Sequence, residues 1–203
     1  MLGLSLEDVL LRAVTYAIVA AIVAGIALGL LRLLATDRWA VEDDETLEGF
    51  AGHFDIMGFI AAIAFRQSWL RPMLPAPQHL RGGRATLALF VPATLLLLLV
   101  ALWVVKFIRI PIAMVSADTL AAGAFALVDT VIQVGVWFAV LNILPIPPLL
   151  GANFIAAIAP NLRPRLRGLY WPGVVVLAVL MYFQVTNAVL GPIVATISGW
   201  VLG

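Results

Sequence analysis

Apolar residues follow one another in long runs along this chain, separated by short stretches in which charges and prolines gather. The runs cover residues 9–34, 53–65, 85–105, 120–141 and 169–203. A helix of about 20 consecutive apolar residues spans the hydrocarbon core of a bilayer. The pattern therefore predicts an all-α polytopic membrane protein with about five to six transmembrane helices. We expect residues 1–203 to form a single transmembrane domain.

The stretches between the runs differ in charge. Residues 37–48 are acidic and are expected to form a solvated loop, whereas 66–84 form a basic, proline-rich connector and 161–168 a basic loop. The apolar piece 153–160 is too short to span and is expected to be re-entrant. Gly191-Pro192 interrupts the last run, which leaves open one long span or a span followed by a half-helix.

The placement of arginine and lysine predicts the orientation, because cytoplasmic loops carry an excess of them. With the N-terminus in the cytoplasm, the acidic loop lies outside, and the connector and the basic loop lie inside. The inside set is then Arg12, Arg66, Arg71, Arg81, Arg84, Arg163, Arg165 and Arg167, and the outside set is Arg32, Arg38, Lys106 and Arg109. The sequence thus predicts a cytoplasmic N-terminus.

Composition narrows the class of protein. Charged residues make up 11% of the chain, far below the quarter that is usual in soluble domains, so a soluble protein is excluded. The absence of cysteine excludes disulfides and thiolate metal sites, and no basic motif indicates a nucleic-acid partner. Five tryptophans near predicted span ends are expected to act as interface anchors. These are Trp69, Trp103, Trp137, Trp171 and Trp200.

Residues 142–151 read Asn-Ile-Leu-Pro-Ile-Pro-Pro-Leu-Leu-Gly and follow directly on an apolar run. Three prolines in four residues cannot continue a helix, because proline lacks the N–H group. Backbone groups that such a break frees inside a membrane must be buried in protein. The break therefore indicates either a functional interior or a simple kinked helix end.

This motif resembles Asn-x-x-Pro-x-Pro-x-x-Asp-Gly of the site-2 proteases, which are intramembrane zinc metallopeptidases. Asn142, Pro145, Pro147 and Gly151 stand at the family's Asn, Pro, Pro and Gly, and Leu150 stands at its zinc-binding Asp.

The similarity extends upstream to one branch of short prokaryotic members. The connector resembles that branch's GWAKPVPVNPRNFRNPR, Phe90-Val-Pro92 resembles its Ala-Gly-Pro, and His53-Phe54-Asp55 with Gly58 is similar to its His-Ile-Asp-Pro-Leu-Gly. The matching connector positions are Trp69, Arg71, Pro72, Pro77, Arg81 and Arg84. The resemblance covers about residues 20 to 160 and implies a site-2-protease-like core in a prokaryotic inner membrane.

The catalytic groups of the family are missing. A register without gaps from His53 places Asp37 on the family's Gly-Asp-Pro aspartate. It places Ala24-Gly25-Ile26-Ala27-Leu28 on its His-Glu-x-x-His. The family's chemistry needs Zn²⁺ on two His and one Asp, with a Glu as base. The resemblance therefore implies the fold and argues against the activity, so we expect a pseudoprotease without a cofactor.

Ionisable groups inside a membrane are functional candidates by default. Asp129 and Gln133 share a helix face. They form either an ion or proton site, or residues bonded to partners and packed in the bundle or against another subunit. His53 and Asp55 are either metal ligands, joined by Asp44 or Glu48, or a cap at a helix start, which the i, i+2 spacing favours.

His79 is expected to be a solvated loop residue. The side-chain amide of Asn142 is expected to pair either with the extended backbone of a bound peptide or with the carbonyls of Leu141 to Pro148 that the break leaves free.

Three functions follow from these residues. The first is an inactive site-2-protease-like subunit that holds a transmembrane helix of a partner complex, or lipid, in a dry groove lined by Ala24, Leu28 and Leu150. The second is a metalloprotease with unusual ligands such as His53, Asp55 and Asp129. The third is a small transporter or ion pathway that uses Asp129.

Overall fold

The computed structural model describes residues 5–36, 50–71, 73–115 and 118–202 of the chain. All its regular elements in these ranges are helices, which confirms the all-α prediction. The α-helices are α1 (Leu6–Leu34), α3 (Ile56–Phe65), α4 (Gly83–Val105), α5 (Arg109–Val115), α6 (Asp118–Leu141), α7 (Ala152–Ile158), α8 (Arg163–Gly168), α9 (Tyr170–Tyr182) and α10 (Val185–Leu202). The 3₁₀ turns are η2 (Phe50–His53), η3 (Pro77–His79), η4 (Lys106–Ile108) and η5 (Pro160–Leu162). The predicted acidic loop 37–48 lies outside the described residues.

Four helices in the described part are long and apolar enough to cross a membrane, so the chain is an integral membrane protein. They are Leu6–Leu34, Gly83–Met114, Ala121–Leu141 and Val185–Leu202. Two shorter apolar helices, α3 and α9, have 10 and 13 residues. The short run 153–160 forms α7, which is one of the shortest helices.

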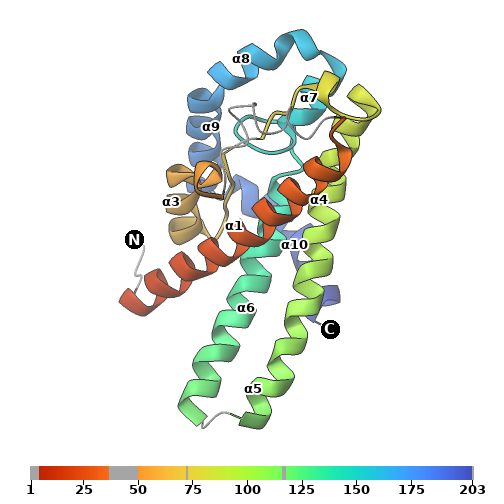
Figure 1. Ribbon diagram of the computed structural model, residues 1–203. Coiled ribbons are helices and arrows are strands. Elements are labelled where there is room, and N and C mark those ends of the chain that lie inside the picture. The colour runs from red at the N-terminus through yellow and green to blue at the C-terminus, as the bar shows by residue number, and fades with distance from the viewer. Residues whose placement is uncertain (1–4, 37–49, 72, 116–117, 203) are drawn as a thin grey trace.

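Three helices build the centre of the molecule. Figure 1 shows α1 crossing in front of α4 and α6, which run side by side, and all three contact one another. A capping box of Ser5 and Asp8 begins α1. The buried face of α1 contributes Val19, Val23 and Ala27 to the core. At Gly135 of α6 the two long helices approach so closely that a Cβ would lie 2.6 Å from the Leu102 side chain. The core therefore depends on small residues where the helices cross.

The connector folds back beside α3 as a buried extended segment. Asp55 caps the start of α3, and Arg66 ends it in the left-handed conformation with φ of 59°. The following backbone is non-helical as far as η3, yet most of its side chains are buried: Gln67, Ser68, Trp69, Leu70, Met73, Leu74 and Ala76. Together, α3 and the described residues of 67–76 form a hairpin.

Trp69 is therefore not the interface anchor that its position in the sequence suggested. It is 2% exposed, because the connector carries it into the core. Gly58 of α3 makes room for it, since a Cβ there would lie 2.1 Å from the Trp69 carbonyl oxygen. Trp103, Trp171 and Trp200 are exposed, with Trp200 at 82%, and fit the predicted anchor role.

The end of α1 meets the end of the connector. The Arg81 N–H donates to the Leu34 carbonyl at 2.7 Å, the Thr36 N–H donates to the His79 carbonyl at 2.9 Å, and Ala35 forms a β-bridge with Leu80. The hairpin of α3 and the connector thus returns to the end of the bundle where α1 finishes. With ten residues, α3 is shorter than a helix that spans a bilayer.

Two local predictions in the C-terminal half also need correction. The arginines of the predicted loop 161–168 form η5 and α8, where Pro164 stands in the first turn and Leu166 packs inward. The last apolar run breaks at Gln184, with φ of 59°, and α10 continues through Pro192. The break lies at Gln184 because polar groups gather there: Gln67 donates from Nε2 to Asn187 Oδ1 at 2.8 Å.

The shared end of α1 and the connector leads to a test of topology. In this cysteine-free chain, single variants Glu7→Cys and Gln78→Cys should react with an impermeant thiol reagent from opposite sides of the membrane, because α1 crosses between them. Labelling of oriented membrane vesicles, with and without permeabilisation, measures the side of each. Asn161→Cys serves as a companion that should label with Gln78→Cys. Labelling of Glu7→Cys and Gln78→Cys from one side would contradict the arrangement.

Candidate functional site

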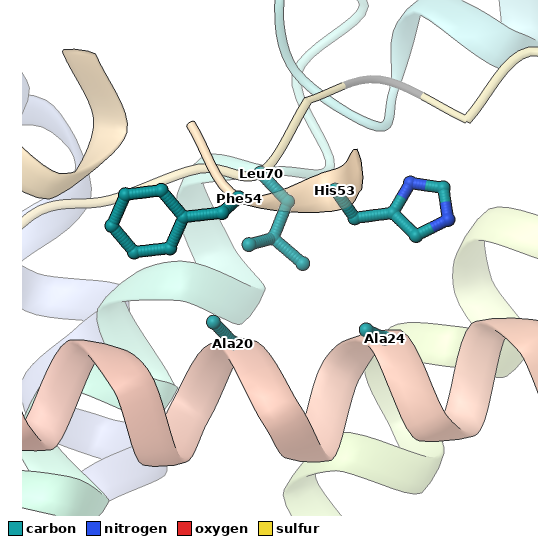
Figure 2. Close-up of a pocket in the computed structure, with 5 residues that line it drawn as sticks. All are labelled: Ala20, Ala24, His53, Phe54 and Leu70. Carbon is teal, nitrogen blue, oxygen red and sulfur yellow. The ribbon is translucent and has the colours of Figure 1, made fainter. Parts of the chain in front are cut away.

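A narrow crevice lies where the resemblance places the first zinc-binding histidine. Ala20 and Ala24 of α1 form one wall, and His53, Phe54 and Leu70 form the other. Figure 2 shows the side chains of His53 and Phe54 pointing in opposite directions along α1. The Leu70 side chain lies between these two residues and faces Ala20 and Ala24. The crevice is too narrow to hold a water molecule. It therefore offers no room for a hydrated metal ion.

The four positions that the resemblance aligns with catalytic residues do not line an open groove. Ala24 is fully buried and Leu150 is 2% exposed, both within the hydrophobic core, whereas Leu28 is half-buried. Gly25 points to the outside of α1, where a Cβ would meet nothing within 4 Å. In this conformation the interior face of α1 is occupied by the protein's own residues.

Asp55 is a structural cap, as its place before α3 suggested. Its Oδ1 accepts the Gly58 N–H at 2.8 Å, and its Oδ2 accepts the Tyr170 hydroxyl at 2.6 Å. The Tyr16 hydroxyl lies 3.1 Å from the carbonyl oxygens of both Asp55 and Trp69. Both carboxylate oxygens of Asp55 are therefore hydrogen-bonded within the fold. Across the described ranges, no three His, Asp or Glu side chains come together as a metal site would require.

His53 and His79 contribute through their backbones. The His53 carbonyl accepts the Arg71 N–H at 3.0 Å, which joins η2 to the connector. The His79 carbonyl accepts from Thr36 at the end of α1, so His79 belongs to the junction of α1 and the connector and is half-buried. The oxygens of Asp44 and Glu48, which would complete a metal site at His53, lie outside the described residues.

Asn142 ties the proline motif to the connector. Its Nδ2 donates to the Ser68 carbonyl at 3.0 Å and to the Phe138 carbonyl at 2.9 Å, and its Oδ1 accepts the Leu150 N–H at 3.3 Å. These acceptors differ from both expectations. The extended backbone belongs to the chain itself, and the Phe138 carbonyl precedes the break and also accepts the Asn142 N–H at 3.0 Å.

The prolines of the motif shape a tight, buried loop. Pro147-Pro148 is a cis peptide bond, and the Gly151 N–H donates to the Asn142 carbonyl at 2.8 Å, which closes the loop. Pro145 lies on the surface, whereas Leu149 and Leu150 enter the core. A Cβ at Gly151 would lie 2.1 Å from the Leu144 carbonyl oxygen. Only glycine fits there.

Two side chains that sequence reasoning did not single out also bind the connector. Asn153 of α7 donates from Nδ2 to the Met73 carbonyl at 2.9 Å, and Arg163 of α8 donates from Nε to the Leu74 carbonyl at 2.7 Å. With Asn142 and Tyr16, these residues supply donors from α1, α6, α7 and α8. The sequence feature that could have identified Asn153 is an asparagine at the start of a short apolar segment.

The connector is thus held as a bound peptide would be. Its carbonyls at Ser68, Trp69, Met73 and Leu74 lie against side-chain donors, and Leu70 fills the wall of the crevice opposite Ala24. The amide that the resemblance assigns to an extended substrate backbone is therefore engaged by Ser68. Chemically, the interior of this site is a scaffold that orders an extended segment.

Asp129 and Gln133 are both bonded to arginines. Asp129 forms an ion pair with Arg109 of α5, and Gln133 Oε1 accepts from Arg66 at 3.3 Å. Lys106 lies 5.5 Å from the ring centroids of both Trp103 and Phe107 in the same region. Both residues thus have arginine partners from elsewhere in the fold, while the Asp129 side chain is 50% exposed and Gln133 lies at the surface.

No protein-family model, curated protein or solved structure matches this chain. The resemblance to site-2 proteases accordingly stays a prediction that rests on the quoted motifs.

The proline motif yields a packing prediction. Replacement of Gly173 in α9 by alanine should lower the stability by about 1–3 kcal/mol or more, because the new Cβ would lie 1.7 Å from the Pro147 carbonyl oxygen. Thermal unfolding in detergent measures the change. Gly168→Ala is the matched control, since a Cβ there meets nothing within 4 Å. Equal melting temperatures of the two variants would contradict the packing of α9 against the motif.

A second prediction concerns the junction of the motif and the connector. Asn142→Asp should destabilise the fold by about 1–3 kcal/mol, because it removes the donor to Ser68 and Phe138 and sets an oxygen against their carbonyls. The same unfolding assay applies, with Asn161→Asp at an exposed position as control. Protease susceptibility of the connector should rise in Asn142→Asp alone. A connector as resistant as in the wild type would count against this bond.

Proposed function

We propose that the protein is a non-enzymatic, site-2-protease-like membrane protein that acts as a binding or assembly subunit of a membrane protein complex. Support comes from the sequence, in which Ala24, Gly25, Leu28 and Leu150 stand at the four catalytic positions that the resemblance defines. None of these side chains coordinates zinc or transfers a proton.

The observation that carries the proposal is that the chain's own connector fills the interior of the protein. The connector fills the space beside α1, and its carbonyls take up the donors of Asn142, Asn153 and Arg163. Opening this space for a substrate would leave those buried donors and carbonyls without partners. Each such group costs about 1–3 kcal/mol. A rigid, self-filled core suits a protein that works through its outer surface.

A partner helix would contact the outer face of α1 rather than an internal groove. Ala17, Ala21 and Gly25 are exposed there, and Gly29 follows one turn later. A Cβ at Gly25 or Gly29 would meet nothing within 4 Å, so the fold does not itself use the small residues of this face. Small residues four apart let helices approach closely in a membrane, where apolar burial gives little driving force.

The sidedness that we propose differs from the one that the sequence predicted. Arg32, Arg81, Arg84, Arg163, Arg165 and Arg167 belong to the end where α1 finishes, and α8 lies at that end in Figure 1. Because α1 crosses between its ends, this basic end lies opposite the N-terminus. The excess of arginine favours the cytoplasmic side for it. We therefore place the protein in a prokaryotic inner membrane with the N-terminus outside.

Native mass spectrometry of the protein, extracted gently from its own membrane, tests the function. A stoichiometric polypeptide bound to the chain, without zinc, is the expected result. A single chain that carries one zinc ion would overturn the pseudoprotease proposal, and a single chain without zinc would overturn the subunit proposal.

The same experiment on variants locates the contact. Gly25→Leu and Gly29→Leu should lose the bound polypeptide while the chain keeps its melting temperature, because the leucines enter open space. Gly199→Leu of α10, which is also exposed with nothing within 4 Å of its Cβ, is the matched control and should retain the partner. Retention of the partner in all three variants would exclude this face of α1.

A further inference from the structure

One exposed polar residue interrupts the buried half of α6. From Val131 to Leu141 every residue of this helix is buried, except that Trp137 is half-buried and Gln133 is exposed. The midpoint of the apolar span Ala121–Leu141 is residue 131, so Gln133 lies about 3 Å from it along the helix axis. A side-chain amide therefore faces outward near the middle of a membrane-spanning helix.

Two arginines and a carboxylate accompany this amide. Arg66, exposed at the end of α3, donates to Gln133 Oε1 at 3.3 Å. One turn before Gln133, on the same face of α6, Asp129 pairs with Arg109 of α5. We call these four residues, Arg66, Arg109, Asp129 and Gln133, the polar window. The window holds two positive charges and one negative charge, so positive charge is in excess.

The excess charge belongs to Arg66. Its hydrogen-bond partner Gln133 is neutral, whereas Arg109 is neutralised by Asp129. No carboxylate of the described residues forms an ion pair with Arg66. Asp8 accepts from Ser5 in the cap of α1, and both carboxylate oxygens of Asp55 are bonded within the fold. The described part of the chain thus leaves the guanidinium of Arg66 for a group from elsewhere.

The position of the window favours a partner helix over a lipid headgroup or a second copy of the chain. Ionisable groups within membrane spans almost always face the interior of a helix bundle, and polar groups hydrogen-bond there across helices. From Gln133, the nearer end of the span is eight residues, or about 12 Å, away, which separates the amide from the headgroups. A twofold pair of chains would set two Arg66 side chains at the same depth and double the excess charge. A carboxylate on a different helix removes it.

We propose that the polar window binds a transmembrane helix of a partner that carries an aspartate or glutamate near its midpoint. The partner's carboxylate pairs with the planar guanidinium of Arg66, and Gln133 donates to the partner from Nε2. Ala122 and Ala126 are exposed on the same face of α6, so a helix can approach closely beside the window. This inference rests on the function proposed above, and adds to the outer face of α1 a second contact of stated chemistry.

Synthetic transmembrane peptides in phosphatidylcholine vesicles test the window. Each peptide is a helix of about 20 leucine and alanine residues flanked by lysines, long enough to span the bilayer, with glutamate, glutamine or leucine at its centre. A dye on Asn161→Cys, at an exposed position of this cysteine-free chain, reports energy transfer from a dye on the peptide. The glutamate peptide should associate about tenfold more tightly than the leucine peptide, on the scale of an interhelical polar contact. The glutamine peptide should lie between them.

Variants of the protein assign this preference to the window. In Arg66→Asn the glutamate peptide should lose its advantage over the glutamine peptide. The melting temperature should stay equal or rise, because asparagine suits the left-handed conformation at φ of 59°. Gln133→Leu should weaken the association of both polar peptides. Thr196→Leu, also exposed on a membrane-spanning helix, is the matched control and should leave the association of all three peptides unchanged.

Three results would overturn the proposal. Equal association of the glutamate and leucine peptides would exclude recognition of a carboxylate, and an unchanged preference in both Arg66→Asn and Gln133→Leu would exclude the window. Energy transfer between differently labelled copies of the protein that disappears in Gln133→Leu would assign the window to a second copy. Native mass spectrometry separates this inference from the proposed function. A bound native polypeptide, together with synthetic peptides that show no preference, would remove the window alone. A single native chain, together with a clear preference for glutamate, would remove the subunit proposal alone.

Discussion

The cost of burying an extended backbone governs the architecture of this protein. A helix satisfies its own N–H and C=O groups, but an extended segment in an apolar interior requires partners from elsewhere. The connector is such a segment, and its carbonyls at Ser68, Met73 and Leu74 are met by Asn142, Asn153 and Arg163. These donors lie on three different elements. Their placement determines where α6, the proline loop, α7 and α8 lie relative to α1.

The proline motif is best understood through the same constraint. Asn142 stands at the turn after α6, where its side chain binds the Phe138 carbonyl of the last helical turn and holds the connector at Ser68. Gly151 and Gly173 allow the loop to pack without steric conflict. A motif that resembles the substrate-facing part of a protease thereby serves the internal cohesion of this chain.

Local pattern predicted the elements well and their three-dimensional pairing poorly. Long apolar runs indicated α1, α4 and α6 within a few residues, and the i to i+3 cap at Asp55 was visible before α3. The return of the connector into the core was not visible in the sequence, because proline-rich basic stretches are typical of solvated loops. The burial of Trp69 was not visible either, since it depends on Gly58, about ten residues away. The positions of Asn153 and Arg163 required knowledge of which distant carbonyls lack partners. The predicted sidedness likewise assumed that each apolar run crosses the bilayer, whereas α3 has only ten residues.

The sequence distance across the connector's hydrogen bonds has a consequence for the order of folding. Its donors Asn142, Asn153 and Arg163 lie 74, 80 and 89 residues after the carbonyls they bind. During synthesis, α1, α3 and the connector therefore leave the ribosome long before their partners exist. Contacts so distant in sequence form late. The connector's carbonyls at Ser68, Met73 and Leu74 therefore lack these donors until α8 has been made. Completion of the connector's hydrogen bonding thus depends on the C-terminal half of the chain.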